Sequence, residues 1–401
     1  ASGAPEWSVD VRVRSNDAIA AVYSPTHALD VRRKAPGHLR ASSKTLKATG
    51  PLRLSIAGGS TRAASVMSYP DVDGTGGTFL MFTGMVPDAN LTLKREVVLV
   101  IDRSGSMRGE RINRVKRAAR RILDGLRPSD TFNLITFNHG LANFANRPVL
   151  ATRENVAAAH RTIDALTAMG GTNLNHAMHL ALQPIPTPGH LPLTVLISDG
   201  LPTVGVTDEG AIRNGLTAKA AGRRIFTVGV GTEINSPLLE ALAIRTRGAA
   251  DFAPTAAELE PVLDRLASRL EGPALSQLQL YASDDGHTGT NGRLSDIVPV
   301  QLPDLFDGDT LVIMGRFTGR APMTLHLGGE TGQGSVDITA RLDPADADVR
   351  LGFVPRLWAT RQIGVLSDRI RENADKTVNK ELIAEIVRLS KEFGVLTEYT
   401  A

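Results

Sequence analysis

The chain has 401 residues, of which 42% are hydrophobic and 22% charged, and its formal net charge is +3. Such a composition is typical of a globular protein with two or three domains and excludes an intrinsically disordered chain. Because the sequence has no cysteine, it also excludes disulfides, thiol catalysis and thiolate metal sites.

No apolar run approaches the roughly 18 residues that span a bilayer, so we expect no membrane insertion. No signal peptide is visible, since residue 1 opens directly into polar sequence. The basic stretch at residues 111–121 follows an amphipathic helical pattern. We interpret it as a solvated helix face and expect no nucleic-acid partner.

The first 95 residues have the pattern of β-structure. In "WSVDVRVRS" (7–15) valines alternate with polar residues, which is the period of a half-buried strand. Residues 51–59 and 78–85 are further strand candidates, and "PDVDGTGG" predicts a turn between strands. Asp71 and Asp73 have calcium-loop spacing in this turn, but the twelfth loop position is not Glu, so we favour a hairpin.

From Val97 onward the pattern becomes an alternation of strands and helices. "VVLVI" is apolar at every residue, as expected of a parallel strand that is covered on both faces. The alternation predicts a doubly wound, mostly parallel α/β sheet with strand order 3-2-1-4-5-6 and an antiparallel strand after residue 140. We expect further strands at 131–137, 191–198, 224–230 and 250–254, and helices near 112–126, 153–168, 173–183, 208–222, 236–247 and 256–270.

After Pro273 the sequence returns to strand-like runs and ends in two amphipathic stripes, which predict a C-terminal helical hairpin. We expect the flanking β-rich segments, neither of which looks complete, to pack together or share one β-sandwich, with the α/β domain inserted between them. The predicted parts are a β-rich segment 1–94, an α/β domain 95–271, a second β-rich segment 272–350 and a helical segment 351–401.

Five oxygen-bearing side chains follow strand ends in the α/β domain. Asp102 closes the strand in "VVLVIDRSGSM", with Ser104 and Ser106 at alternating positions after it. Asp199 closes a later strand in "ISDGLPT", and Thr172 lies between the two in "MGGTNLNHAM". Ligands of doubly wound sheets bind beyond the carboxyl ends of the strands, where the strand order reverses. We therefore expect all five side chains to converge from three loops.

Carboxylates and hydroxyls are hard ligands that suit Mg²⁺, which takes about six oxygens at roughly 2.0–2.1 Å. Three hydroxyls and two carboxylates can hold such an ion directly or through water and leave one position open for a partner's carboxylate. Mn²⁺ and Ca²⁺ are the alternatives. Taken singly, Asp102 could cap the next helix, the serines could be turn residues, and Thr172 could be an N-cap.

These motifs resemble the metal-ion-dependent adhesion site of von Willebrand factor type A domains. The stretches "LRPSDTFNLITFN", "RIFTVGVG", "QLPDLFDGD" and "RLWATRQIGVLSDRIRE" resemble the inter-alpha-trypsin inhibitor heavy chain family and its bacterial relatives. In that family a vault/inter-alpha-trypsin (VIT) domain precedes the A domain, so residues 1–94 would be a shortened VIT-like domain. The resemblance implies direct metal contacts from Ser104, Ser106 and Thr172, and contacts mostly through water from Asp102 and Asp199.

The resemblance implies a protein that binds proteins or matrix components and is not an enzyme in this region. We expect a divalent-cation-dependent adhesion or protein-interaction module in an extracytoplasmic bacterial protein. One alternative is a structural scaffold whose A domain is merely stabilised by metal. Another is a metal-dependent hydrolase, although no His or Glu is placed as a general base near Asp102. The chain stops at "EYTA", without the Asp-Pro-His sequence that joins animal heavy chains to hyaluronan, so we expect no hyaluronan transfer.

Three weaker signals have ordinary explanations. His176 and His179 lie one helical turn apart but have no evident third zinc ligand, which favours surface positions. "VGVGTEIN" lacks the glycine spacing of nucleotide-binding loops. Pro261 is the only helix breaker between residues 256 and 270. It is tolerated if it lies in the first turn; otherwise it could be a yield point that couples this helix to the metal loops.

Overall fold

The computed structural model describes residues 7–25, 27, 29–46, 52–58, 64–84, 93–220, 222–271, 274–284, 291–306, 309–372 and 376–400. The chain divides into two compact units, each of which we describe by itself. The A unit spans residues 89–274, and the flanking unit combines residues 1–88 with residues 275–401.

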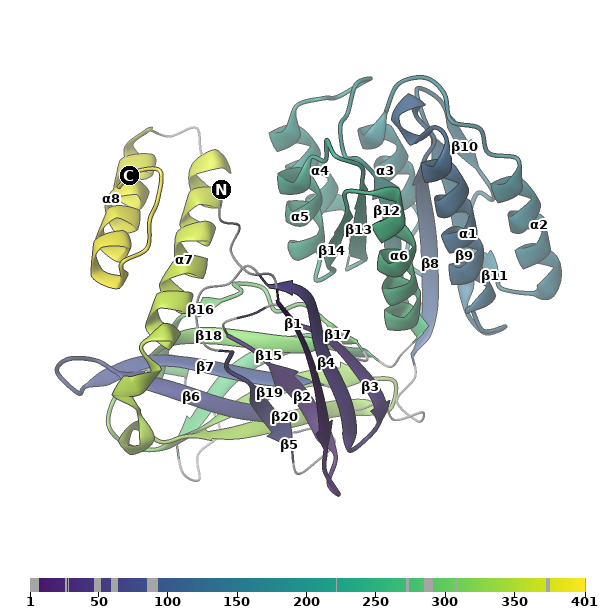
Figure 1. Ribbon diagram of the computed structural model, residues 1–401. Coiled ribbons are helices and arrows are strands. Elements are labelled where there is room, and N and C mark those ends of the chain that lie inside the picture. Colours follow the sequence, from purple (N-terminus) through teal and green to yellow (C-terminus); the bar gives the residue numbers. More distant parts are fainter. Residues whose placement is uncertain are drawn as a thin grey trace. The chain divides into compact units, whose positions relative to one another are not determined.

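A seven-stranded sheet forms the centre of the A unit (Figure 1). Its order is β10-β9-β8-β12-β13-β14, with β11 beside β9, so the strand order reverses between β8 and β12. This is the predicted order, and β10 and β11 run antiparallel to β9 while the other strands are parallel. The strands are β8 (Lys94–Asp102), β9 (Thr131–Phe137), β10 (Leu141–Asn143), β11 (Val149–Leu150), β12 (His190–Ser198), β13 (Arg224–Val230) and β14 (Ala250–Ala253).

Helices cover both faces of this sheet, which is why Val97–Ile101 is buried at every residue. One face packs against α3, α4 and α5 in a single hydrophobic cluster. Helix α1 contacts α2 and α6. Side chains of Thr152, Asp208 and Asn235 cap three of the helices, as their sequence positions favour. The helices are α1 (Glu110–Asp124), α2 (Arg153–Asp164), α3 (Leu174–Leu182), α4 (Glu209–Lys219), α5 (Ser236–Ile244) and α6 (Ala256–Glu271).

The described residues of the flanking unit form four sheets and two α-helices. The sheets have the orders β1-β4-β3, β17-β15-β19-β20, β16-β18-β7-β6 and β2-β5. Its elements are β1 (Trp7–Arg14), β2 (Ile19–Tyr23), β3 (Asp30–Ala35), β4 (His38–Leu46), β5 (Ser55–Gly58), β6 (Ala64–Pro70), β7 (Gly76–Gly84), β15 (Ala274–Asp284), β16 (Leu294–Val298), β17 (Leu305–Phe306), β18 (Thr310–Thr318), β19 (Met323–Thr331), β20 (Gly334–Leu342), α7 (Phe353–Glu372) and α8 (Lys376–Phe393).

Strand β7 is an inner strand of the β16-β18-β7-β6 sheet and joins segments that are far apart in the sequence. It pairs with β6 on one side and, over its whole length, with β18 on the other. Leu80 and Phe82 of β7 belong to a hydrophobic cluster that includes Val354 and Trp358 of α7 and Ile386 of α8. One sheet and one core are therefore built from both ends of the chain.

The predicted fold class is confirmed: a doubly wound, mostly parallel domain, flanking β-sheets and a C-terminal pair of helices. The hairpin turn predicted at residues 70–77 is confirmed too, since it links β6 to β7 and the Asp73 carboxylate accepts a hydrogen bond from Thr75 N. Asp71 is paired with Arg316 at 2.8 Å, which is a structural role.

The basic stretch on α1 is more than a solvated face. Arg114 and Arg117 lie 3.4 and 3.6 Å from the Glu260 carboxylate, and Arg121 lies 2.5 Å from Asp264. Both acidic residues are on α6, so these arginines join two neighbouring helices.

The first-turn explanation of Pro261 is wrong. Helix α6 begins at Ala256, so Pro261 is an interior residue of the helix, where it removes a backbone donor.

We expect Pro261→Ala to raise the free energy of unfolding of the A unit by about 1–2 kcal/mol. Restoring an ordinary helix residue gains up to about 3 kcal/mol, and the more flexible unfolded chain gives back about 0.4–1 kcal/mol. Denaturation followed by far-UV circular dichroism measures the difference. An unchanged or lowered stability would show that the helix has adapted to the proline.

Candidate metal centre

Asp102 is the buried carboxylate of the candidate site. It ends β8, is fully buried, and both of its carboxylate oxygens are engaged. Ser104 N donates to Oδ1 at 2.8 Å, and the Ser198 hydroxyl donates to Oδ2 at 2.5 Å. Ser198 ends β12, the strand that pairs with β8 at the reversal of strand order. The sheet topology thus fixes this carboxylate in place, with its oxygens turned to protein donors.

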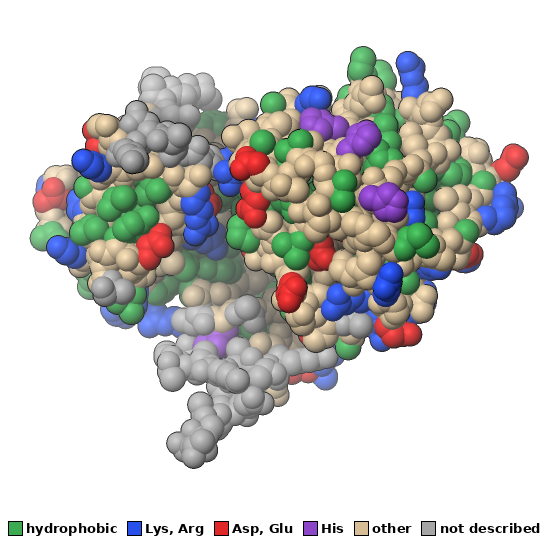
Figure 2. Space-filling model, turned by 90° about the horizontal axis from the view of Figure 1, so that it is seen from above, with side chains coloured by type: hydrophobic (Ala, Val, Ile, Leu, Met, Phe, Trp, Pro, Cys, Tyr) green, Lys and Arg blue, Asp and Glu red, His purple; other side chains and the backbone are tan. Residues whose placement is uncertain are grey.

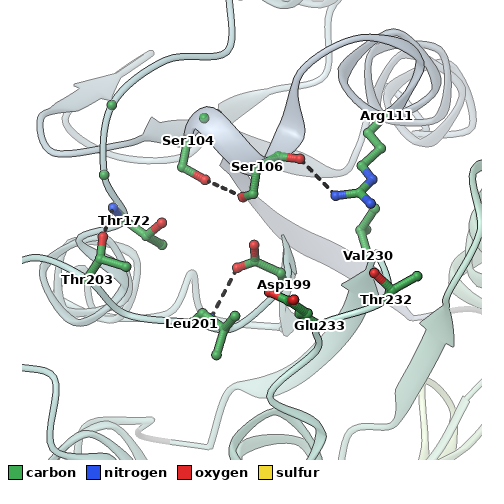
Figure 3. Close-up of a pocket in the computed structure, with 14 residues that line it drawn as sticks. Ser104, Ser106, Arg111, Thr172, Asp199, Leu201, Thr203, Val230, Thr232 and Glu233 are labelled. Atoms are coloured by element: carbon green, nitrogen blue, oxygen red, sulfur yellow. Dashed lines mark hydrogen bonds between the residues drawn. The ribbon is translucent and has the colours of Figure 1, made fainter.

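Two serine hydroxyls lie beside one another in the loop that follows β8. Ser104 Oγ and Ser106 Oγ are 3.0 Å apart (Figure 3). The edge of an Mg²⁺ octahedron with bonds of roughly 2.0–2.1 Å is about 2.9 Å long, so the two oxygens are spaced as neighbouring ligands would be. Gly105 N donates to Gly170 O at 2.9 Å, which ties this loop to the loop that carries Thr172.

Thr172 is held by its backbone. Its N–H donates to Thr203 Oγ1 at 2.8 Å, and its carbonyl accepts from Thr203 N at 3.0 Å. The N-cap of α3 is Asn173, whose side chain accepts a hydrogen bond from His176 N, so the capping role considered for Thr172 is wrong. The Thr172 side chain faces the cavity instead.

Asp199 follows β12 and is nearly buried. Its Oδ1 accepts from Leu201 N at 3.1 Å, and its carbonyl accepts from Asn235 N at 2.9 Å. Gly200 next to it has φ +77°, and a Cβ there would lie 2.9 Å from the Leu239 side chain. The turn after Asp199 therefore requires glycine, which explains the "SDG" sequence.

A cavity of about 370 Å³ brings four of the five predicted residues together. Ser104, Ser106, Thr172 and Asp199 line it, whereas Asp102 lies outside the lining and reaches it only through its neighbours. The converging arrangement expected from the sequence is thus present, with Asp102 as a support behind the wall.

The electrostatics of this site favour a cation. Burial raises the pKa of Asp102 to about 6, the negative charge of Asp199 adds to the rise, and the hydrogen bonds from Ser198 and Ser104 only partly oppose it. No cationic side chain is among these influences. A buried carboxylate without a positive partner is costly, and a divalent cation nearby would remove that cost. The residues therefore fit a bound Mg²⁺.

Several residues at the site were missed by sequence reasoning. Ser198 and Thr203 position Asp102 and Thr172, and Arg111 and Glu233 line the cavity. Glu233, in the turn after β13, is on the cavity wall, although sequence reasoning placed no His or Glu as a general base near Asp102 (Figure 3). The signal was its place after the strand next to β12, in a segment considered only for nucleotide binding.

His176 and His179 do not add a zinc site. Both lie on α3, and His176 is exposed while His179 is half-buried. Among the described residues no cluster of three or more His, Cys, Asp or Glu side chains could hold a metal ion. The candidate site differs in kind, because most of its ligands would be hydroxyls.

A hydroxyl–imidazole–carboxylate chain lies on the flanking unit. Ser283 Oγ and Asp337 Oδ2 are each 2.7 Å from a ring nitrogen of His326, and the Tyr281 ring stacks on His326 at 4.7 Å. Ser283 and Asp337 are diagonal neighbours of His326 across β15, β19 and β20, and Tyr281 lies directly opposite it. Asp337 is 41% exposed. We interpret the chain as cross-strand contacts that stabilise the sheet.

Comparisons with known proteins agree with this geometry. The model of the von Willebrand factor type A domain family matches residues 96–265. In solved structures the fold is similar to a von Willebrand factor type A protein from Catenulispora acidiphila (TM-score 0.57, 14% identity, 83% of this chain and 86% of that one). It is also similar to the ArnB paralog VWA2 from Sulfolobus acidocaldarius (TM-score 0.52, 16% identity, 85% and 92%). Residues 96–265 are therefore a von Willebrand factor type A domain.

The chain is also similar to inter-alpha-trypsin inhibitor heavy chains over most of its length. The chain is 28% identical over 338 residues to human inter-alpha-trypsin inhibitor heavy chain H4, covering 79% of this chain and 35% of the relative. It is 26% identical over 344 residues to heavy chain H2 of Sus scrofa, covering 81% and 36%. The chain thus contains a von Willebrand factor type A domain and is similar to inter-alpha-trypsin inhibitor heavy chains, of which it spans about a third of the length.

Proposed function

We propose that this chain is a divalent-cation-dependent protein-interaction module that binds an acidic group of a partner protein or matrix component. The observation that carries the proposal is the pair of hydroxyls 3.0 Å apart, in one cavity with Asp199 and next to the buried Asp102 carboxylate. Ser104, Ser106 and Thr172 would hold Mg²⁺ directly. Asp102 and Asp199 would act mostly through water, as the engagement of both Asp102 oxygens favours.

A bound Mg²⁺ would supply an electrophilic centre that accepts a partner's carboxylate. Neutral hydroxyl ligands leave most of the ion's charge uncompensated, so an anionic sixth ligand is favoured. The protein's own part is to place the hydroxyls, to keep the cavity open and to fix the positions of the two carboxylates. None of these steps requires proton transfer, so we propose a binding function and not an enzyme.

The proposal extends to location and rejects two alternatives. We propose a place outside the cytoplasm, which rests on the similarity to the heavy chains. Among the residues that the structure describes, no helix has the length and apolar composition of a membrane span.

A scaffold would bind metal without gaining affinity for carboxylate ligands. A hydrolase would use Glu233 as its base, so phosphoester turnover that is lost in Glu233→Gln would favour that function.

We expect the whole chain to bind Mg²⁺ in titration calorimetry. Ser104→Ala and Asp102→Ala should weaken or abolish binding, because one removes a ligand and the other the supporting charge. Thr207→Ala, at an exposed threonine before α4, is the matched control and should bind as the unchanged chain does. Absence of binding at millimolar metal would reject the proposed function.

Metal should also stabilise the A unit. Saturation at 100 times Kd adds about 2.7 kcal/mol, or roughly 5–10 °C in Tm for a unit of this size. Both tryptophans (Trp7 and Trp358) and all four tyrosines lie in the flanking unit. Their fluorescence does not report on the A unit, so the shift must be measured by calorimetry or far-UV circular dichroism and reversed with EDTA.

A further inference from the structure

Arg111 is the cationic side chain that reaches the candidate metal site. It lies in the first turn of α1, and its Nη1 donates to the carbonyl of Ser106 at 2.9 Å (Figure 3). Its guanidinium lines the same cavity as Ser104, Ser106 and Asp199. The positive charge thus lies in the cavity beside Ser106, one of the residues whose hydroxyls would hold the metal.

The backbone makes room for this guanidinium at Gly231. This residue follows β13, has φ +113°, and a Cβ there would lie 3.1 Å from Nη1 and 3.2 Å from Cζ of Arg111. A Cβ at this position would crowd the guanidinium, which would have to shift by a few tenths of an ångström. Glycine at 231 therefore leaves room for the Arg111 head group at the site.

Arg111 differs from the other arginines of its helix. Arg114, Arg117, Arg120 and Arg121 each pair with a carboxylate on α6 or α2. Within the described part of the chain, Arg111 forms no ion pair, and its recorded hydrogen bond is the one to Ser106 O. A guanidinium has five N–H donors, so most of its capacity is left for a ligand.

We propose that Arg111 is a second anchor for the partner's carboxylate. This inference rests on the proposed function: one carboxylate oxygen would bind the metal held by Ser104 and Ser106, and the other would accept hydrogen bonds from Arg111. Glu233 also lines this cavity and repels an incoming anion, so the Arg111 guanidinium would give the carboxylate a favourable place to bind. The two-point contact selects a carboxylate over a neutral amide or hydroxyl, which cannot be both a metal ligand and an anionic acceptor.

Acetate bound to the Mn²⁺-loaded whole chain tests this inference. Relaxation of the acetate protons by Mn²⁺ reports how much acetate reaches the metal, and calorimetry gives the metal affinity separately. We expect Arg111→Gln to weaken acetate binding by about tenfold or more, with metal affinity within about twofold of the unchanged chain. The acetate affinity of Arg111→Lys should lie between those of Arg111→Gln and the unchanged chain, because lysine keeps the charge but lacks the planar guanidinium.

Two further variants separate anchoring from general charge effects. Arg117→Gln removes the same charge from the same helix but away from the cavity, and it should leave acetate binding unchanged. Gly231→Ala keeps every charge but crowds the guanidinium, and it should weaken acetate binding less than Arg111→Gln does. Acetamide in place of acetate should show little dependence on residue 111.

Each remaining outcome decides against the inference. Equal acetate affinity in Arg111→Gln and Arg117→Gln would show that the partner site does not use Arg111, while the metal site stands. Loss of metal affinity in Arg111→Gln would make Arg111 a positioning residue for the Ser106 loop. If the unchanged chain binds no metal, the proposed function fails first and the inference fails with it.

Discussion

Asp130→Ala is expected to lower the free energy of unfolding of the A unit by about 3–5 kcal/mol, because it leaves the buried guanidinium of Arg95 without its counter-charge. The side chains of Arg95 and Asp130 are 4% and 0% exposed. Arg95 Nη2 lies 2.5 Å and Nε 3.0 Å from Asp130 Oδ2, and Arg95 N donates to Oδ1 at 2.9 Å.

The same guanidinium joins three elements, which makes its loss costly. Nη1 donates to Leu270 O near the end of α6, and Nη2 donates to Gly125 O at the end of α1. A cation at the carboxyl ends of two helices is also favoured by their dipoles. Without Asp130, the charge would be held only by carbonyl oxygens in a region that excludes water.

A surface pair on the same helices is the matched control. Arg121 and Asp264 are also 2.5 Å apart, but their side chains are 52% and 41% exposed. Asp264→Ala should therefore cost less than about 1 kcal/mol. Hydrogen exchange of β8 and β9 amides measures both variants within the A unit. Equal losses for Asp130→Ala and Asp264→Ala would contradict the assignment of a buried, charge-dependent anchor.

The A unit could be predicted well from its sequence because its strands are covered on both faces. The sequence of such a strand is an unbroken apolar run, as in β8, and the helices between the strands have clear apolar stripes. Local motifs also placed Asp102, Ser104 and Ser106, since all three follow one strand. The first-turn explanation of Pro261 and the N-cap alternative for Thr172 were wrong by about one turn and one residue, which is the ordinary error of helix boundaries from sequence.

Residues that act through sheet register could not be predicted in the same way. Ser198 bonds to Asp102 across 96 positions, and the contact exists only because β12 pairs with β8. Arg111 reaches its place because Gly231, far along the chain, leaves room for it. Neither residue has a local pattern that distinguishes it from an ordinary surface arginine or strand-end serine.

The flanking unit was harder to predict for a physical reason. Strands with a solvent face, such as β3 with sequence "DVRRKA", carry too many charged residues to stand out from loops. The pairing of β7 with β18 joins residues such as Thr78 and Arg316, which are 238 positions apart. Sequence periodicity predicts where strands lie but not which strands pair with one another. The domain boundaries at 1–94, 272–350 and 351–401 therefore stay predictions.

Residues 1–88, expressed alone, are expected to stay largely unfolded, whereas residues 89–274 should fold and retain the metal site. In 1–88 one edge of β7 would lose its whole pairing with β18, although every residue of β7 is buried in the intact chain. Leu80 and Phe82 would also lose the helices that cover them. The exposed apolar edge would favour aggregation over folding.

A third chain makes this prediction decisive. Residues 1–88 joined by a short flexible linker to residues 275–401 restore β7–β18 and the α7–α8 cover, so this chain should fold with the A unit deleted. Amide dispersion in NMR spectra measures folding in all three chains, and Trp358 emission reports the core of the joined one, where its side chain is 4% exposed. The A unit supplies none of the strands in the β7 sheet, so its removal should leave that sheet intact. A well-dispersed spectrum from 1–88 alone, or a collapsed one from the joined chain, would mean that the flanking unit does not depend on the union of its two segments.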